Sequence, residues 1–415
     1  MAVKKKYNHM KIQAHKTERL HSLDSLRAIM MLLGLVLHAA ITYGSINYGG
    51  LWSLKDSNTT HISNDFIVFF IHYFRMPTFF LVSGFFGAML FYERSPMKML
   101  KNRVERIVLP FVVFLILLWP FIYFSFEYSG LIFGGNLDAK GVVLANFSEF
   151  KTWIPTWTFH LWFLYYLAMI TFVTVLLALV LKRIPRLGSY FSKSFSWLIQ
   201  QPVLRILIFT GITVLTYFMM GTAWLGDPFS FIPKLNTFIF YGSFYSIGWV
   251  LFKSKHLLDA FKKYDWLNLI LGIILFSIYF YNRFTFGYEA EIFMKSIIVW
   301  LLIFGFTGLF IRYGSKHSAR MRYLSDSSYW VYLVHLPFTA FIPGLLADWP
   351  IPSTLKFLVV LISTTIICYV SYHYLVRATF IGAFLNGRKY SRKLDDIKPL
   401  EKPVIPNMTL VTDNK

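Results

Sequence analysis

The chain has 415 residues, of which 56% are hydrophobic and 20% aromatic. A soluble domain of this length does not carry so much apolar side-chain surface, so the composition predicts a multi-pass membrane protein. The formal net charge of +21 gathers in short loops between apolar runs. We therefore interpret the charge as a signal for membrane orientation and as attraction to anionic membrane lipids, and we expect no nucleic-acid partner.

Runs of about 20 apolar residues predict about ten membrane-spanning helices and an all-α fold. In chain order we expect these helices at residues 28–45, 66–91, 107–127, 159–181, 203–224, 236–252, 266–282, 291–312, 328–347 and 356–377. Together they make one transmembrane domain over 23–386, with a basic N-terminal segment at 1–22 and a polar tail at 387–415.

Basic residues alternate from loop to loop. Lys and Arg crowd the start of the chain and every second loop after it, at 94–106, 182–186, 253–263 and 312–322, and they recur in the tail. The loops between these are nearly neutral or acidic. Because short loops rich in Lys and Arg stay in the cytoplasm, both termini are predicted to be cytoplasmic, and the even number of spans agrees.

The first apolar run carries two ionisable groups, Arg27 and His38, eleven residues apart. On an α-helix this spacing brings both side chains within about 20° of one face and about 16 Å apart along the axis. Ionisable groups inside a membrane persist mainly where they face a protein interior or a wet cavity. A cation at the membrane edge and an imidazole near the middle indicate a path for an anionic reactant that ends where a proton moves.

The second run places Arg75 near the depth of His38, with His72 one turn away on the same face and Pro77 able to open the helix. Arg75 either pairs with a carbonyl or carboxylate to hold helices together, or contacts the substrate or the transition state. The sequence leaves both roles open, and the same is true of His72. The small-residue pair Ser83-Gly84 is better explained by a close contact between helices than by a nucleophile.

The third run begins with Arg103 and Arg106, three residues apart on one helical face. Two guanidinium groups in this arrangement suit phosphate binding, although the positive-inside rule requires basic residues here in any case. In the ninth run His335 follows Tyr332 by one turn and precedes Pro337. A lone histidine on an apolar face is more often a buried structural residue, so the depth of His335 in the run is what makes it a candidate.

Aromatic residues gather where the long loop 128–158 ends and the next apolar run begins. We expect this loop on the outer side of the membrane. Trp157, His160 and Trp162 lie near the expected outer interface. An aromatic belt explains the tryptophans most simply, but aromatic faces also hold sugar rings, and His160 is placed to meet an external acceptor. No spacing of His, Cys and carboxylate residues resembles a metal site, and we expect no metal and no permanently bound cofactor.

Five segments follow one another in a familiar order and spacing: LDSLRAIMMLLGLVLH, FRMPTFFLVSGFF, RVERIVLP, HLWFLYYL and SYWVYLVHLPF. Together they resemble the membrane acyltransferase-3 family over nearly the whole chain, from Leu23 to about Asn386. Within that family the similarity is greatest to the glucan biosynthesis protein C group, which implies succinylation of periplasmic glucans.

The resemblance also implies roles for individual residues. Arg27 and His38 match the essential pair of the family, and Arg103 and Arg106 match the arginines that serve an acyl-CoA donor. Asp24 fits the opening Asp-x-x-Arg of the family and would hold the guanidinium of Arg27 on the donor path.

The expected reaction is acyl transfer across a bacterial inner membrane, with succinyl or acetyl moving from cytoplasmic acyl-CoA to a hydroxyl of an extracytoplasmic glycan. His38 acts as general base or accepts the acyl group itself, Arg75 stabilises the oxyanion, and His335 matches a late histidine of the family. The alternative is a transporter or flippase for an anionic or lipid-linked solute, since intramembrane His and Arg beside a Pro-broken helix are also transporter traits.

Overall fold

The computed structural model describes residues 20–223, 225, 228–393 and 396–397, and all regular structure in these ranges is helical. Nine helical segments of this part of the chain are long and apolar enough to cross a membrane. The chain is therefore a multi-pass membrane protein. The predicted terminal segments 1–22 and 387–415 lie mostly outside the described residues.

The helices are α2 (His21–Ala40), α3 (Ile62–Glu93), α4 (Pro96–Arg103), α5 (Leu109–Phe133), α6 (Ala139–Asn146), α7 (Trp162–Leu181), α8 (Pro185–Gln200), α9 (Pro202–Met220), α10 (Leu235–Lys253), α11 (Asp265–Asn282), α12 (Tyr288–Tyr313), α13 (Ala319–Leu345), α14 (Ser353–Ser371) and α15 (Phe380–Asn386). Short helical turns include η1 (Ile41–Tyr43), η2 (Gly49–Leu51), η3 (Val104–Val108), η4 (Phe150–Trp153), η5 (Phe159–Leu161), η6 (Lys255–Lys262) and η7 (Tyr372–Val376).

The nine segments follow the predicted runs, with two differences. The π-helical turn η3 joins α4 to α5, so that one helical segment runs over Pro96–Phe133 where the sequence predicts 107–127. It starts early because the Ser95 side chain caps it and Pro96 occupies its first turn. The predicted span 328–347 falls mainly in α13, which is 27 residues long but carries polar residues such as Asp326 and is not among the nine.

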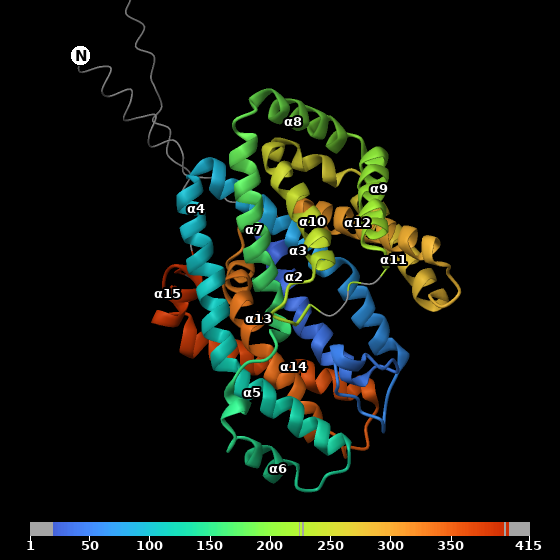
Figure 1. Ribbon diagram of the computed structural model, residues 1–415, viewed down its shortest axis with the longest axis vertical. Coiled ribbons are helices and arrows are strands. Elements are labelled where there is room, and N and C mark those ends of the chain that lie inside the picture. The colour runs from blue at the N-terminus through green and yellow to red at the C-terminus, as the bar shows by residue number, and fades with distance from the viewer. Residues whose placement is uncertain (1–19, 224, 226–227, 394–395, 398–415) are drawn as a thin grey trace, which may run out of the picture.

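Helix α2 lies at the centre of the bundle, in contact with α3, α12, α13 and α14. Figure 1 shows it in the middle of the molecule, with α8 across one end and α6 near the other. Its buried side chains, among them Leu26, Met31 and Ala39, occur around most of its circumference. A helix needs this pattern when neighbours surround it, and the packing fixes the directions in which Arg27 and His38 point.

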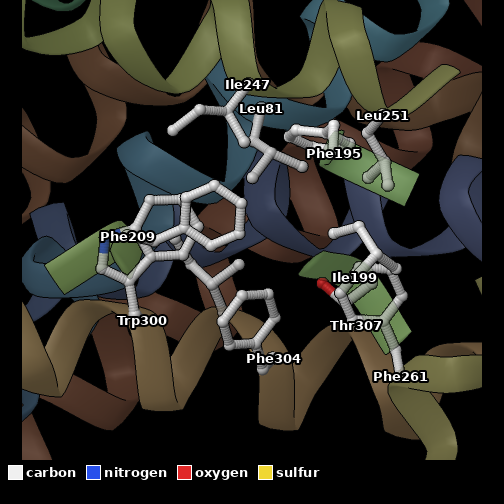
Figure 2. Close-up of a pocket in the computed structure, with 11 residues that line it drawn as sticks. Leu81, Phe195, Ile199, Phe209, Ile247, Leu251, Phe261, Trp300, Phe304 and Thr307 are labelled. Atoms are coloured by element: carbon white, nitrogen blue, oxygen red, sulfur yellow. The ribbon is translucent and has the colours of Figure 1, made fainter. Parts of the chain in front are cut away.

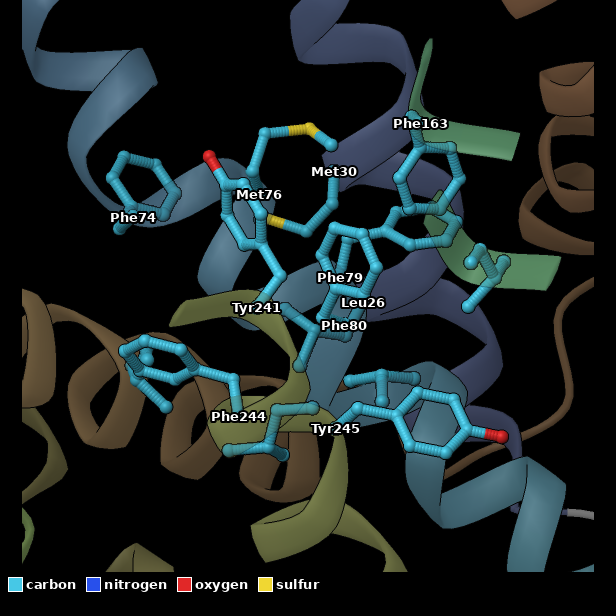
Figure 3. Close-up of a cluster of buried hydrophobic side chains, with 14 of the residues drawn as sticks. Leu26, Met30, Phe74, Met76, Phe79, Phe80, Phe163, Tyr241, Phe244 and Tyr245 are labelled. Atoms are coloured by element: carbon cyan, nitrogen blue, oxygen red, sulfur yellow. The ribbon is translucent and has the colours of Figure 1, made fainter. Parts of the chain in front are cut away.

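Aromatic packing and close backbone contact hold α3 against its neighbours. Figure 3 shows the aromatic cluster, in which the Phe79 and Phe163 rings meet edge to face with centroids 4.5 Å apart. A Cβ added at Gly84 would overlap the carbonyl oxygen of Tyr245, so α3 and α10 touch backbone to backbone. The close helix contact predicted at Gly84 is thus confirmed.

A small gap on the α8–α9 side of α3, shown in Figure 2, is lined by apolar and aromatic side chains. Its volume is about 10 Å³, which leaves room for no more than one water molecule. Beside it, Phe209 stacks on Trp300 at 4.7 Å, and Trp300 donates its indole N–H to Thr213 at 2.8 Å. The polar side chain in the lining is that of Thr307, so this region mainly supports the bundle.

Candidate active site

Helix α2 places Arg27 near its start and His38 near its end. Arg27 pairs with Asp24 at 3.2 Å, and its guanidinium lies 5.1 Å from the centre of the Phe86 ring of α3. The Arg27 side chain is 36% exposed, so the pairing leaves part of the guanidinium open to a ligand. His38 lies eleven residues further along the same helix, among residues of other elements.

Three histidines from three separate elements form one cluster, here called the histidine cluster. The rings of His38 (α2) and His335 (α13) lie with centroids 5.3 Å apart, and those of His335 and His160 (η5) lie 5.2 Å apart. His335 and His160 are only 1% and 6% exposed. His160, which the sequence predicts near the outer interface, lies in η5 directly before α7, with its side chain buried in the protein.

Backbone contacts fix the tautomers of two of these rings. His335 lies with Nδ1 2.8 Å from the Tyr332 carbonyl, so Nδ1–H donates and Nε2 keeps its lone pair. His160 lies with Nε2 2.9 Å from the Leu333 carbonyl, so its Nδ1 keeps the lone pair. His335 Nε2, His160 Nδ1 and His38 Nδ1 are all buried and have no hydrogen-bond partner among the described residues. Buried nitrogens without partners are costly, and here they indicate a place for a group that donates hydrogen bonds.

Arg75 lies against α2 one turn from His38. A Cβ added at Gly34 would lie 3.3 Å from the Arg75 Cζ and would overlap its Nη1, so the guanidinium occupies the space that the glycine leaves. Within the described part of the chain, Arg75 has no carboxylate partner, and its Nε has no hydrogen-bond partner. An ion pair of Arg75 with a carboxylate, one form of the structural alternative, is therefore absent from the described residues, and both predicted roles of Arg75 stay open.

A cavity of about 500 Å³ opens beside Arg27. Four arginines line it, Arg27, Arg103, Arg106 and Arg322, from α2, α4, η3 and α13. Two carboxylates also line it: Asp24 pairs with Arg27 at 3.2 Å and Asp326 with Arg322 at 2.9 Å, which leaves a net positive wall. Its inner walls are largely apolar: Met31, Phe79, Phe86, Phe163, Leu164 and Leu167. This combination suits an amphiphilic molecule that carries phosphate at one end and a long, weakly polar arm at the other.

The two arginines predicted as a phosphate-binding pair both line this cavity but have different surroundings. Arg106 donates to the carbonyls of Ala383, at 2.9 Å, and Phe384, so it caps the last turn of α15. Arg103 has two guanidinium nitrogens, Nε and Nη2, that are buried without a partner in the described ranges. Arg103 is therefore the more available phosphate ligand of the two.

The cavity ends just below the histidine cluster. On the α3 side its lining stops at Phe79, four residues from Arg75, and on the α7 side at Phe163, three residues from His160. On α2 it stops at Met31, seven residues or about 10 Å of helix from His38. The gap contains Tyr332 of α13, which is 7% exposed and donates its hydroxyl to the His160 carbonyl at 2.8 Å.

Of the remaining predicted residues, His72 lies one turn from Arg75 on α3, close enough for its charge to interact with those of Arg75 and His38, and its side chain is exposed. Trp157 is 42% exposed beside Phe159 and Phe229. Trp162 is 8% exposed and packs against Tyr241 with ring centroids 5.5 Å apart, which makes it part of the core.

Sequence reasoning missed Trp52, Gly34 and Arg322. Trp52 stacks on the His38 ring with centroids 5.3 Å apart, and Arg322 has a buried Nη1 without a partner at the cavity wall. Trp52 gave no sequence signal because it lies in a loop between spans. Gly34 did give one, since a small residue four positions before a functional histidine leaves room on the same helical face.

Comparisons with known proteins identify the family of the chain. Residues 20–373 match the model of the acyltransferase-3 family, described as an acyltransferase domain. The proteins called Glucans biosynthesis protein C from Escherichia coli O81 (strain ED1a), Shigella dysenteriae serotype 1 (strain Sd197) and Escherichia coli (strain K12) are each 27% identical to the chain over 393 residues, covering 92% of this chain and 98% of theirs. No solved structure matches the chain. The family match covers most of its length, so the chain belongs to the acyltransferase-3 family and is a membrane enzyme that transfers acyl groups.

Proposed function

We propose that this enzyme takes an acyl group from acyl-CoA at the cytoplasmic face and transfers it to a hydroxyl of a glycan outside the membrane. The observation that carries the proposal is the cationic cavity whose inner end stops within one to two helical turns of the histidine cluster. The phosphates of the donor bind Arg103, Arg27 and Arg322. The pantetheine arm follows the apolar walls toward His38.

The chemistry follows from the groups at the end of that path. His38 removes the proton from the acceptor hydroxyl, the hydroxyl oxygen forms a bond to the acyl carbon, and the C–S bond of the thioester breaks. The proton held by His38 then goes to the departing CoA thiolate, so protons and charges balance. Arg75, one turn from His38, stabilises the negative oxygen of the tetrahedral intermediate.

The unpartnered nitrogens of His335 and His160 bind the acceptor by accepting hydrogen bonds from its hydroxyl groups. A covalent acyl-His38 intermediate is the other route through the same residues, and it needs no simultaneous binding of donor and acceptor. The two routes differ in kinetics: the covalent route gives ping-pong behaviour and a burst of CoA release without acceptor.

The direction of transfer depends on sidedness. We propose that α13 is the tenth span, that both termini face the cytoplasm of a bacterium, and that the membrane is the inner membrane. The alternation of basic loops supports this orientation. A glycan is the proposed acceptor because the similar proteins are named for glucan biosynthesis. The acyltransferase domain favours this enzyme over the transporter alternative.

Sealed inverted vesicles test the proposal. Acyl-CoA with a labelled acyl group is added outside, and a glucan acceptor is trapped in the lumen. We expect CoA release and labelled lumenal glucan, both dependent on His38. Little label should appear when the glucan is supplied only on the donor side. Equal or greater labelling of the donor-side glucan would contradict transfer across the membrane, and no acyl-CoA consumption in either arrangement would contradict the proposed reaction.

A further inference from the structure

The segment 44–61, which joins α2 to α3, packs as a plug over the end of α2 that carries His38. In its extended stretch the side chains of Trp52, Leu54 and Asp56 are 4%, 2% and 0% exposed, while Ser53 between them is exposed. Alternation of this kind is what an extended backbone gives when one side faces a protein interior. A surface loop does not bury its side chains in this way.

Trp52 makes the contact with the candidate active site. Its indole ring stacks on His38 at an interplanar angle of 28°, and its N–H donates to the Thr42 hydroxyl at 2.9 Å. On the other side it meets the Phe126 ring of α5 edge to face, with centroids 4.9 Å apart. Trp52 thus fills the space between His38 and the loop surface.

Two anchors hold the plug in place. Asp65 of α3 accepts hydrogen bonds from the backbone N–H of Ser45 at 2.6 Å and from the Tyr48 hydroxyl at 2.9 Å. Burial and the neighbouring Asp65 carboxylate raise the pKa of Tyr48 above its ordinary value, so the hydroxyl stays a donor. At the far end, Asp56 and Lys356 form a buried ion pair at 2.8 Å.

We propose that Trp52 is a positioning residue that holds the His38 ring and shields it from external water until an acceptor displaces the plug. This inference rests on the proposed function. An acyltransferase whose donor site faces one side must keep water from the acyl carbon while no acceptor is bound, because water attack gives free acid and CoA and wastes the donor. A plug on the acceptor side that carries an indole stacked on the catalytic base meets that need.

The test compares Trp52→Ala with Trp52→Phe and with Trp153→Ala, in purified full-length enzyme with acyl-CoA. Trp153 is a matched control because it is 50% exposed and donates its N–H to the Phe147 carbonyl, away from His38. We expect Trp52→Ala to raise acceptor-independent CoA release relative to acceptor-dependent transfer by roughly tenfold, since it removes both the shield and the stacking partner. Trp52→Phe should restore most of the wild-type ratio, and Trp153→Ala should leave it unchanged.

A labelling experiment tests whether the plug shields position 38, without relying on acyl transfer. In a Cys368→Ala background, His38→Cys is exposed to a membrane-impermeant thiol reagent from the outer side. We expect protection while Trp52 is present and labelling about tenfold faster or more with Trp52→Ala. Tyr48→Phe, which loosens the Asp65 anchor, should act in the same direction if Trp52→Ala does not fold.

The outcomes separate the two ideas. Equal labelling with and without Trp52, or an unchanged ratio of hydrolysis to transfer, would overturn the shielding role. If wild-type enzyme consumed no acyl-CoA while labelling still depended on Trp52, the proposed function would fail and the plug would stand.

Discussion

Substituting Gly34 tests whether catalysis depends on the position of the Arg75 guanidinium or whether Arg75 is simply a buried residue. The methyl carbon of Gly34→Ala would overlap Arg75 Nη1 and sit 3.3 Å from Cζ, so the guanidinium must move by roughly 1.3 Å to reach ordinary contact distance. The end of a flexible side chain makes that shift at low energetic cost. Alanine also favours a helix interior by about 0.5–1 kcal/mol over glycine, so the free energy of unfolding should stay the same or rise slightly.

Activity should respond very differently. A displacement of about 1 Å at a group that stabilises the transition state costs about 10²-fold in rate. We therefore expect kcat for acyl transfer to fall by about two orders of magnitude, with the KM for acyl-CoA little changed, because Arg75 does not line the donor cavity. The assay is CoA release with saturating acceptor, beside thermal unfolding of the same preparation.

Gly242→Ala is the matched control. Gly242 lies in α10, and a Cβ added there would meet nothing within 4 Å. It should keep full activity with the same small gain in helix stability. If Gly34→Ala folded normally and transferred acyl groups within twofold of wild type, Arg75 would not act at the position argued here. A large loss of thermal stability would instead show that the guanidinium cannot move.

Three further predictions follow from the same contacts. Arg103→Ala should raise the KM for acyl-CoA roughly 10- to 100-fold, because it removes a charge-assisted phosphate contact. Arg106→Ala should mainly lower the melting temperature, because it uncaps α15. Steady-state kinetics and thermal unfolding of both variants would tell the two roles apart. Lys356→Met should lower the free energy of unfolding by about 3–5 kcal/mol, because it leaves Asp56 buried without its partner. The double variant with Asp56→Leu should recover most of that loss in denaturation experiments. A small effect of Lys356→Met alone would contradict burial of the pair. His38→Ala should abolish transfer with the protein still folded and inserted, and near-normal acylation of the glucan would rule out its catalytic role.

Much of the architecture can be predicted because each membrane-spanning helix is recognisable from its own stretch of sequence. Each apolar run is a local property of the sequence, and so is the spacing of Arg27 and His38 on one helix. Depth in the membrane is also nearly local, which explains why Arg75 was expected at the level of His38 and lies one turn from it.

The contacts between distant segments are what the sequence alone does not reveal. His160 and His335 are 175 residues apart in the sequence, yet the centroids of their rings are 5.2 Å apart. The sequence predicts Arg106 as one of two phosphate ligands, but in the structure its guanidinium donates to a backbone carbonyl of α15, 277 residues later. Trp52 belongs to a loop, where no periodicity predicts which side chains turn inward.

The packed residues between the inner end of the cavity and the plug also decide where the membrane potential acts. If packed protein separates the phosphates at Arg103 from the acceptor side, the membrane potential falls across the region around His38, and CoA itself stays outside most of that field. The acyl group then crosses outward, and the proton of the acceptor hydroxyl crosses inward to the CoA thiolate. Acetyl transfer therefore moves one positive charge inward, whereas succinyl transfer moves one negative charge outward in addition, and each charge that crosses the full field is worth about 2.3 kcal/mol per 100 mV. A voltage imposed on sealed vesicles therefore reads out the charge of the acyl group that the enzyme prefers, without any need to identify the glycan.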